Sequence, residues 1–246
     1  MNDTVFIILF IYSGSLIGKF LNNLTYESFK NKEHKISIRF FSICPQCKIR
    51  TRYFFIPFLD YILNNRKCLY CGYIFPTSSL FLEILTSIYC PFCYVYLVTF
   101  KKQPLKLLPA VFFGTILILI SFIDIKHKII PNKIIIPSIL IGLVLQILFF
   151  SNKTMQWVIF SVGAGLFFLI ISLIYHEGMG MGDVKLATFL GVLLGKNVLL
   201  AIAIAFVMGA LFSIILLIFK IKRIKDKIPF APFLAIGAII AYFIQK

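Results

Sequence analysis

The sequence predicts an all-α polytopic membrane protein of about eight transmembrane helices, with a zinc-binding insertion on the cytoplasmic side. The membrane class follows from composition: 60% of the 246 residues are hydrophobic, only 14% are charged, and the mean hydropathy is +0.97. A water-soluble fold of this length cannot bury that much apolar surface, so lipid must be the main solvent. The insertion follows from two CxxC sequences inside the one long polar stretch.

Apolar runs account for the expected helices, because about 20 apolar residues are needed to cross a bilayer. The sixth run is too short for a full crossing, and we expect it to be a half-span or to extend into its neighbours. The first run lacks the basic start and the small-residue cleavage site of a signal peptide. The eight runs are 5–24, 79–100, 105–123, 134–150, 157–175, 186–196, 197–219 and 229–245.

The net charge of +16 would suggest nucleic-acid binding in a soluble protein. Here the placement of the charge has a different explanation, and we expect no nucleic-acid partner. Most Lys and Arg residues fall in alternate loops, which predicts that these loops face the cytoplasm and that the N-terminus lies outside. These alternate loops are 25–78, 124–133, 176–185 and 220–228.

The chain is expected to divide into four parts. A first transmembrane helix, 1–24, is followed by the polar cytoplasmic loop 25–78. The second transmembrane helix and an outer loop occupy 79–104, and the remaining membrane domain occupies 105–246.

The polar loop has the cysteine spacing of a metal site. Two CxxC pairs about 20 residues apart suit four thiolates around a tetrahedral zinc, each pair coming from one tight turn. The alternative of two disulfides is disfavoured in the reducing cytoplasm. The zinc is expected to be structural, because the loop is too short to build a core of its own. The expected ligands are Cys44, Cys47, Cys68 and Cys71.

Two acids at membrane boundaries are the candidate catalytic residues. Asp124 ends an apolar run, and Asp183 closes the glycine-rich string 178–182. A carboxylate in such a place is costly, which indicates a function. Two carboxyls that share one proton can activate water. The pair therefore predicts an intramembrane aspartyl protease, and the alternative is an incidental acid at a helix start.

Further candidates lie near these segments. Glu83, a few residues into the second run, either forms an ion pair or contacts a polar ligand. Lys185 either holds a substrate carboxylate or marks the cytoplasmic side. Gly180 and Gly182 give backbone freedom beside Asp183 and would let an extended substrate approach closely.

In their order and spacing, these motifs resemble the bacterial type IV prepilin leader peptidases, bifunctional enzymes that also N-methylate their products. The resemblance covers nearly the whole chain. Its most specific piece is the segment Gly178–Leu186, which contains a GxGD sequence. The other pieces are the two CxxC pairs, 56–59, 82–86, Asp124 with 130–132, and 228–237.

The resemblance implies a specific activity. Such enzymes remove the short basic leader of prepilins and pseudopilins after a glycine, on the cytoplasmic face of the bacterial inner membrane. They then methylate the new N-terminal residue with S-adenosylmethionine. Asp124 and Asp183 would be the catalytic pair, and 105–246 would be the aspartyl peptidase domain.

The resemblance also implies that the cysteine tetrad organises a methylation-associated loop. Glu83, Lys185, Gly180 and Gly182 are the candidates for contact with substrate or methyl donor. The S-adenosylmethionine site is inferred from the resemblance alone, because the chain has no phosphate-type glycine fingerprint for a nucleotide cofactor. Two alternatives stay open. The protein is a peptidase without methylation, or it is a membrane scaffold whose acids are structural.

Overall fold

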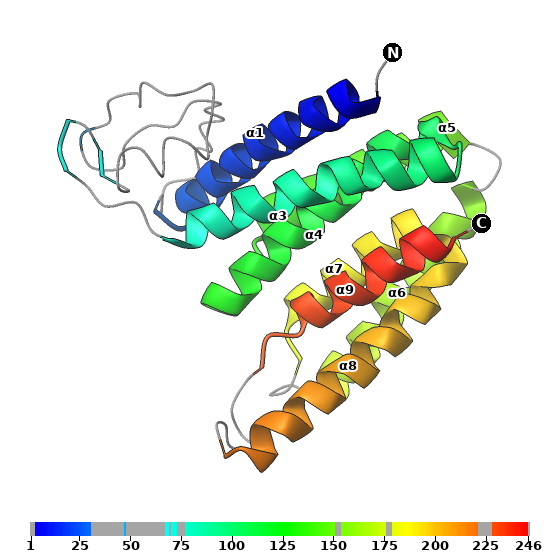
Figure 1. Ribbon diagram of the computed structural model, residues 1–246. Coiled ribbons are helices and arrows are strands. Elements are labelled where there is room, and N and C mark those ends of the chain that lie inside the picture. Colours follow the sequence, from blue (N-terminus) through cyan, green and yellow to red (C-terminus); the bar gives the residue numbers. More distant parts are fainter. Residues whose placement is uncertain are drawn as a thin grey trace. The chain divides into compact units, whose positions relative to one another are not determined.

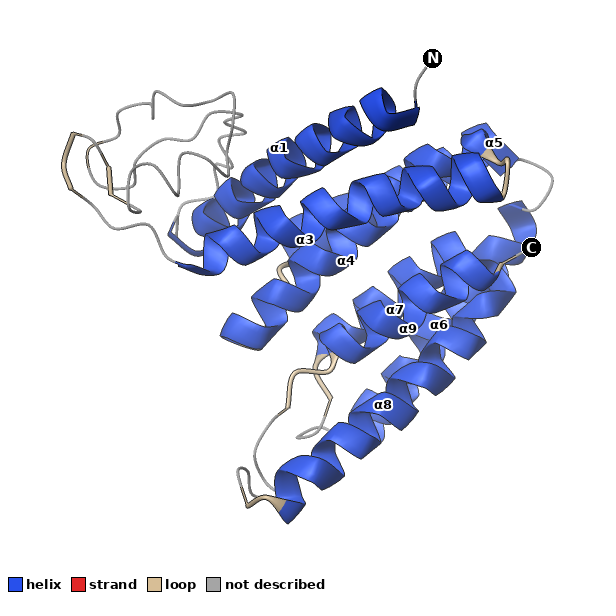
Figure 2. Ribbon diagram, in the orientation of Figure 1, coloured by secondary structure: helices blue, strands red, loops and turns tan. Residues whose placement is uncertain are grey.

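The computed structural model describes residues 3–30, 47, 67–68, 70–72, 77–150, 154–175, 179–220 and 228–245. Every regular element of two or more residues in these ranges is a helix, which confirms the predicted all-α class for the described part of the chain (Figure 2). The chain forms two compact units, Met1–Val111 and Phe112–Lys246.

The first unit is built on two long helices that lie side by side, α1 (Asp3–Lys30) and α3 (Thr77–Tyr94) (Figure 1). A π-helical turn, Val95–Phe100, extends α3. The two helices approach closely because α1 presents glycines to α3: a Cβ atom at Gly14 would lie 2.5 Å from the carbonyl oxygen of Thr86. Small residues at such a crossing allow the dispersion contacts that hold apolar helices together in lipid.

Glycine spacing and an aromatic contact together define this crossing. Gly18 lies one helical turn after Gly14, and a Cβ atom there would be 2.7 Å from the Cα atom of Glu83. Nearer the N-terminus of α1, the ring of Phe10 stacks on Tyr94 with a centroid distance of 4.9 Å.

The second unit contains the C-terminal part of α4 (Leu107–His127) and five further helices. These are α5 (Asn132–Phe150), α6 (Thr154–Ile174), α7 (Met181–Leu194), α8 (Val198–Ile218) and α9 (Ala231–Ile244). Helix α7 is apolar on all sides and buries nine of its 14 residues, as expected for a helix surrounded by others. Helices α5, α6 and α9 pack against it, and α8 packs along α9 (Figure 1).

Aromatic side chains connect α4 to this core. The ring of Phe113 contacts Phe189 of α7 and Tyr242 of α9, with centroid distances of 5.7 and 5.5 Å. The outer faces of α5, α6 and α8 expose large apolar residues instead, among them Leu148, Ile174 and Ile218. Such faces fit contact with lipid acyl chains.

Six segments of the described chain are long and apolar enough to cross a membrane, which supports the multi-pass class. They do not establish the eight spans expected from the sequence. The sixth and seventh runs appear as α7, a short turn and α8 within one apolar segment, Met181–Ile218, and α9 has only 14 residues. At about 1.5 Å per residue, neither α7 nor α9 alone covers a hydrocarbon core of about 30 Å.

The C-terminal end of short α7 is buried, and a polar side chain satisfies its carbonyl groups. Gln146 of α5 is buried and donates hydrogen bonds to the carbonyl oxygens of Val192 and Leu193, at 3.3 and 3.1 Å. The chain then turns at Gly195, which has a positive φ of 53° and lies against the ring of Trp157. A side chain at this position would be strained and would meet the ring.

Candidate active site

Asp124 lies in the last turn of α4, because this helix continues to His127 rather than ending where the apolar run ends. The amide of Lys128, which has a positive φ of 55°, donates to the carbonyl oxygen of Asp124 at 2.8 Å and closes the helix. The carboxyl group is turned into the second unit, and the residue is only 7% exposed.

The buried carboxyl of Asp124 meets the start of α9. Its Oδ2 atom accepts a hydrogen bond from the backbone amide of Ala231, 3.1 Å away. Ala231 is the first residue of α9, and its preceding residue, Phe230, offers no side-chain cap. Asp124 therefore supplies the hydrogen-bond acceptor that a helix N-terminus requires.

Sequence reasoning missed Ala231 as part of the site. In the sequence, the stretch 228–237 contributed only to the family resemblance. Pro232 at the second helical position was the available signal, because proline is tolerated there and marks a helix start. No local signal indicates that this helix start would meet Asp124.

Asp183 lies in the first turn of α7, half-buried. Its amide donates to the carbonyl oxygen of Gly180 at 3.0 Å, and the amide of Gly180 in turn bonds the Asp183 carboxyl. This reciprocal pair resembles a capping box. The carboxyl groups of Asp183 and Asp124 are close enough for a direct electrostatic interaction. The structure thus brings together the two acids singled out in the sequence.

The turn between α4 and α5 packs on the start of α7. A Cβ atom at Gly182 would lie 2.9 Å from Cβ of Ile130, so this glycine is needed for the contact. The segment that packs closely on Gly182 is therefore the α4–α5 turn of this same chain, where an extended substrate was expected from the sequence. At Gly180, which is exposed, the nearest atoms to a Cβ would be Oδ2 of Asp183 and the Gly182 amide nitrogen, both at 3.9 Å.

Lys185 also forms a hydrogen bond within the chain. Its Nζ atom donates a hydrogen bond to Oδ1 of Asn132, 2.6 Å away, and so connects α7 to the first residue of α5. On the other side of the glycine string, Ser172 of α6 donates to the carbonyl oxygen of Met179 at 3.2 Å. Residues His176, Glu177 and Gly178 lie outside the described residues.

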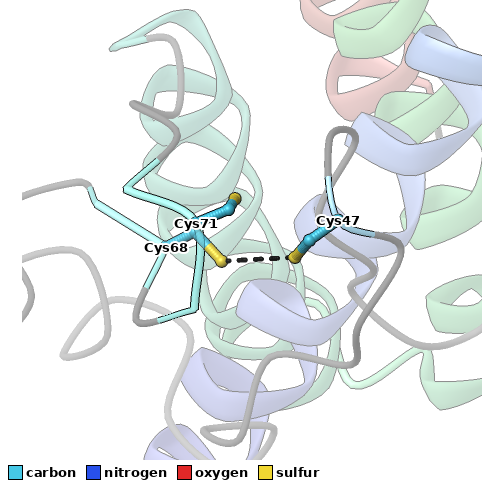
Figure 3. Close-up of side chains that lie close together, drawn as sticks. All are labelled: Cys47, Cys68 and Cys71. Carbon is cyan, nitrogen blue, oxygen red and sulfur yellow. Dashed lines mark hydrogen bonds between the residues drawn. The ribbon is translucent and has the colours of Figure 1, made fainter.

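In the first unit, three of the four expected metal ligands form a cluster (Figure 3). The sulfur atoms of Cys47, Cys68 and Cys71 lie within 4.8 Å of one another, and those of Cys47 and Cys68 are 3.8 Å apart. Four sulfurs bound at 2.3 Å to a tetrahedral zinc would be about 3.8 Å apart, so the cluster fits this metal. Cys44 lies outside the described residues.

The turn at the second cysteine pair has the geometry of a metal-binding knuckle. The amide of Gly72 donates to the carbonyl oxygen of Cys68 at 2.9 Å, and Gly72 has a positive φ of 69°. Glycine adopts this conformation without strain. Both thiols of the pair are thereby presented from one short turn.

Comparison with known proteins places the chain in a family. Residues 111–214 match the Type IV leader peptidase family, and residues 12–97 match the Bacterial Peptidase A24 N-terminal domain. A prepilin leader peptidase/N-methyltransferase of Bacillus subtilis (strain 168) is 30% identical over 207 residues, which cover 82% of this chain and 80% of that protein. The chain belongs to the type IV leader peptidase family.

Other relatives with the same name extend the match. The protein of Legionella pneumophila is 31% identical over 87% of this chain and 77% of its own length. That of Pseudomonas putida is 28% identical over 98% of this chain and 91% of its own length. No solved structure matches the chain. These findings confirm the family resemblance inferred from the sequence motifs.

Each family match lies almost entirely within one structural unit of the chain. The match over 111–214 contains Asp124 and Asp183 but ends before α9, which holds Ala231. The match over 12–97 contains Glu83 and the four cysteines of the expected zinc site.

Glu83 lies on α3 and is only 9% exposed. It is on the helix face that α1 approaches, since Gly18 of α1 lies against its backbone. An acidic residue so placed within an apolar helix pair is uncommon and indicates a function by default. Glu83 therefore remains the candidate binding residue of the N-terminal unit.

Proposed function

We propose that this chain is a membrane-embedded aspartyl peptidase that removes the leader peptide of prepilins, with Asp124 and Asp183 as its catalytic pair. One observation carries the assignment: two carboxyl groups from the ends of different apolar helices lie close enough for an electrostatic interaction. Membership of the type IV leader peptidase family and the names of the relatives supply the substrate class.

The chemistry requires one ionised and one protonated carboxyl. The carboxylate takes a proton from water as the water oxygen attacks the scissile carbonyl carbon, and the carboxylic acid gives its proton to the carbonyl oxygen. The resulting diol collapses when the first carboxyl protonates the leaving nitrogen and the second recovers a proton from a hydroxyl. One water molecule is consumed, and the pair returns to its starting protonation.

The site is also suited to an extended substrate. Gly180 is exposed beside Asp183 and leaves space for a peptide backbone to approach. We propose that the leader is cut after a glycine, and that pseudopilins are cut in the same way. The positions of the basic loops support a cytoplasmic site in a multi-pass inner-membrane protein.

The second proposed activity is N-methylation of the new N-terminal residue, which the double name of the relatives supports. The sulfur atoms of Cys47, Cys68 and Cys71, with Cys44, would hold a zinc ion that organises the polar loop. S-adenosylmethionine would supply the methyl group when bound. We propose that Glu83 contributes to binding of the methyl donor or the pilin N-terminus.

The decisive experiment is cleavage of a purified prepilin by the detergent-solubilised protein. Asp124→Asn and Asp183→Asn should each reduce the rate by at least about 1,000-fold, because the two carboxyls act as a unit. Asp3→Asn, at an exposed residue that starts α1, should retain the rate. Mass spectrometry of the mature pilin tests methylation separately, since replacement of an amine hydrogen by a methyl group adds a net CH₂ to the mass.

The outcomes separate the proposed activities from the alternatives. Cleavage by both Asn variants would exclude the aspartyl mechanism. Failure of folded wild-type protein to cleave would favour a membrane scaffold with structural acids. Cleavage that yields only unmethylated product would leave a peptidase without the second activity.

A further inference from the structure

The N-terminal turn of α9 contacts the candidate active site through its backbone, outside the part of the chain that matches the peptidase family. A helix start leaves several amide groups without intrahelical partners. In α9, the amides of Phe233 and Leu234 both donate to the carbonyl oxygen of Phe230, at 3.1 and 3.2 Å. Pro232 has no amide hydrogen. The amide of Ala231 therefore donates outside the helix, to Oδ2 of Asp124.

We infer that the backbone amide of Ala231 is a positioning group for Asp124, and that the start of α9 is a third structural part of the active site. The inference rests on the proposed role of Asp124. The backbone amides of Ala231 and Phe230 both bond the Asp124 carboxyl, the Ala231 amide at Oδ2, so the start of α9 fixes this carboxyl in rotation. An amide can only donate, and a helix N-terminus favours negative charge, so the contact also favours the carboxylate form.

An aromatic cluster holds this helix start in place. The ring of Phe230 contacts Phe206 of α8 and Phe168 of α6, with centroid distances of 5.3 and 6.2 Å. Three residues further on, Phe233 contacts Phe212 of α8 with a centroid distance of 5.4 Å. Phe168 is fully buried. The cluster thus links the packing of α6, α8 and α9 to the orientation of Asp124.

The sharpest test replaces a single hydrogen-bond donor. Lactic acid at position 231, in place of Ala231, exchanges the amide N–H for an ester oxygen and keeps the side chain. Loss of a hydrogen bond to a charged group should lower kcat for prepilin cleavage by about 10- to 100-fold, while KM changes little. Ala231→Gly, which retains the amide, measures any contribution of the side chain, and its kcat should stay above that of the ester variant.

A matched control uses the same chemistry about two helical turns along. Lactic acid at position 238, in place of Ala238, removes a backbone amide in the interior of α9. It should leave kcat within about threefold of wild type. Equal losses from the esters at 231 and 238 would overturn the inference, because they would indicate general weakening of α9. No loss from the ester at 231 would overturn it as well.

A measurement independent of activity separates this inference from the proposed function. Hydrogen exchange of the Ala231 amide should speed up on Asp124→Ala, whereas exchange of the Phe233 amide should not. Unchanged protection of Ala231 would show that Asp124 is not its acceptor, even if both aspartates prove essential for cleavage. Conversely, inactivity of the wild-type protein would count against the peptidase assignment. The hydrogen-exchange result would then still decide whether the Ala231 amide bonds Asp124.

Discussion

Nζ of Lys185 lies 2.6 Å from Oδ1 of Asn132, and this hydrogen bond joins the two sequence motifs that flank the paired aspartates. Lys185 follows Asp183 by two residues, and Asn132 begins α5 directly after the turn that follows Asp124. The sequence left open whether Lys185 binds substrate or marks the cytoplasmic side. The structure adds a third role, which is to hold the α4–α5 turn against α7.

A double-mutant cycle tests this role. Lys185→Met and Asn132→Ala should each lower kcat/KM for cleavage about 2- to 10-fold, and the double variant should lose no more than either single variant, because both remove one hydrogen bond. Lys196→Met, at an exposed residue after α7, is the matched control and should be neutral. If Lys185→Met raises KM while Asn132→Ala has no effect, Lys185 contacts substrate instead.

Close packing of Ile130 on Gly182 predicts a second phenotype. Gly182→Ala places a methyl group 2.9 Å from Cβ of Ile130, so the turn must shift and cleavage should fall at least about tenfold. Gly182→Ala combined with Ile130→Ala should recover much of the activity. Gly163→Ala, on α6 with no atom within 4 Å of the new methyl, should keep both activity and stability. No recovery in the double variant would argue against steric conflict with Ile130.

Gln146 predicts an effect on stability rather than on chemistry. Gln146→Leu leaves the buried carbonyl groups of Val192 and Leu193 without their donor, which should cost about 1–3 kcal/mol of unfolding free energy. Thermal unfolding in detergent measures the loss. Gln156→Leu, at an exposed position on α6, is the control and should change stability little. A Gln146→Leu variant as stable as wild type would show that these carbonyl groups need no cap.

Removal of the cysteine cluster should separate the two proposed activities. Cys68→Ser is expected to lower the zinc content of the purified protein to a small fraction of wild type and to abolish methylation, while cleavage continues. Cys90→Ser is the control, because Cys90 is buried in α3 and belongs to a different CxxC pair. Full zinc content in Cys68→Ser, measured by elemental analysis, would contradict the proposed metal site.

Much of the architecture could be predicted from the sequence because the responsible forces act locally. Apolar runs must become helices in lipid, since every backbone amide and carbonyl has to be bonded within its own segment. A carboxylate near the lipid has a high free-energy cost, which made Asp124 and Asp183 candidates from the sequence alone. The cysteine spacing predicted a ligand set, and three of its members meet in the structure.

Helix ends were harder to predict than helix cores. Apolar runs placed Asp124 just after a helix and Asp183 just before one. The structure places both inside first or last turns, because α4 continues to His127 and α7 begins at Met181. Polar residues at a helix end are compatible with the helix, so the edge of an apolar run does not mark the edge of the helix.

By itself, therefore, the sequence determined the membrane class, the approximate helices, the two candidate acids and the cysteine motif. The tertiary structure alone decided that Ala231 bonds Asp124, that Ile130 fills the space beside Gly182, and that Gln146 caps α7. These contacts join residues distant in the chain. Helices such as α7 are apolar on all sides and carry no stripe that would indicate which face meets which neighbour. Only the packing of all the helices of the unit together specifies those partners.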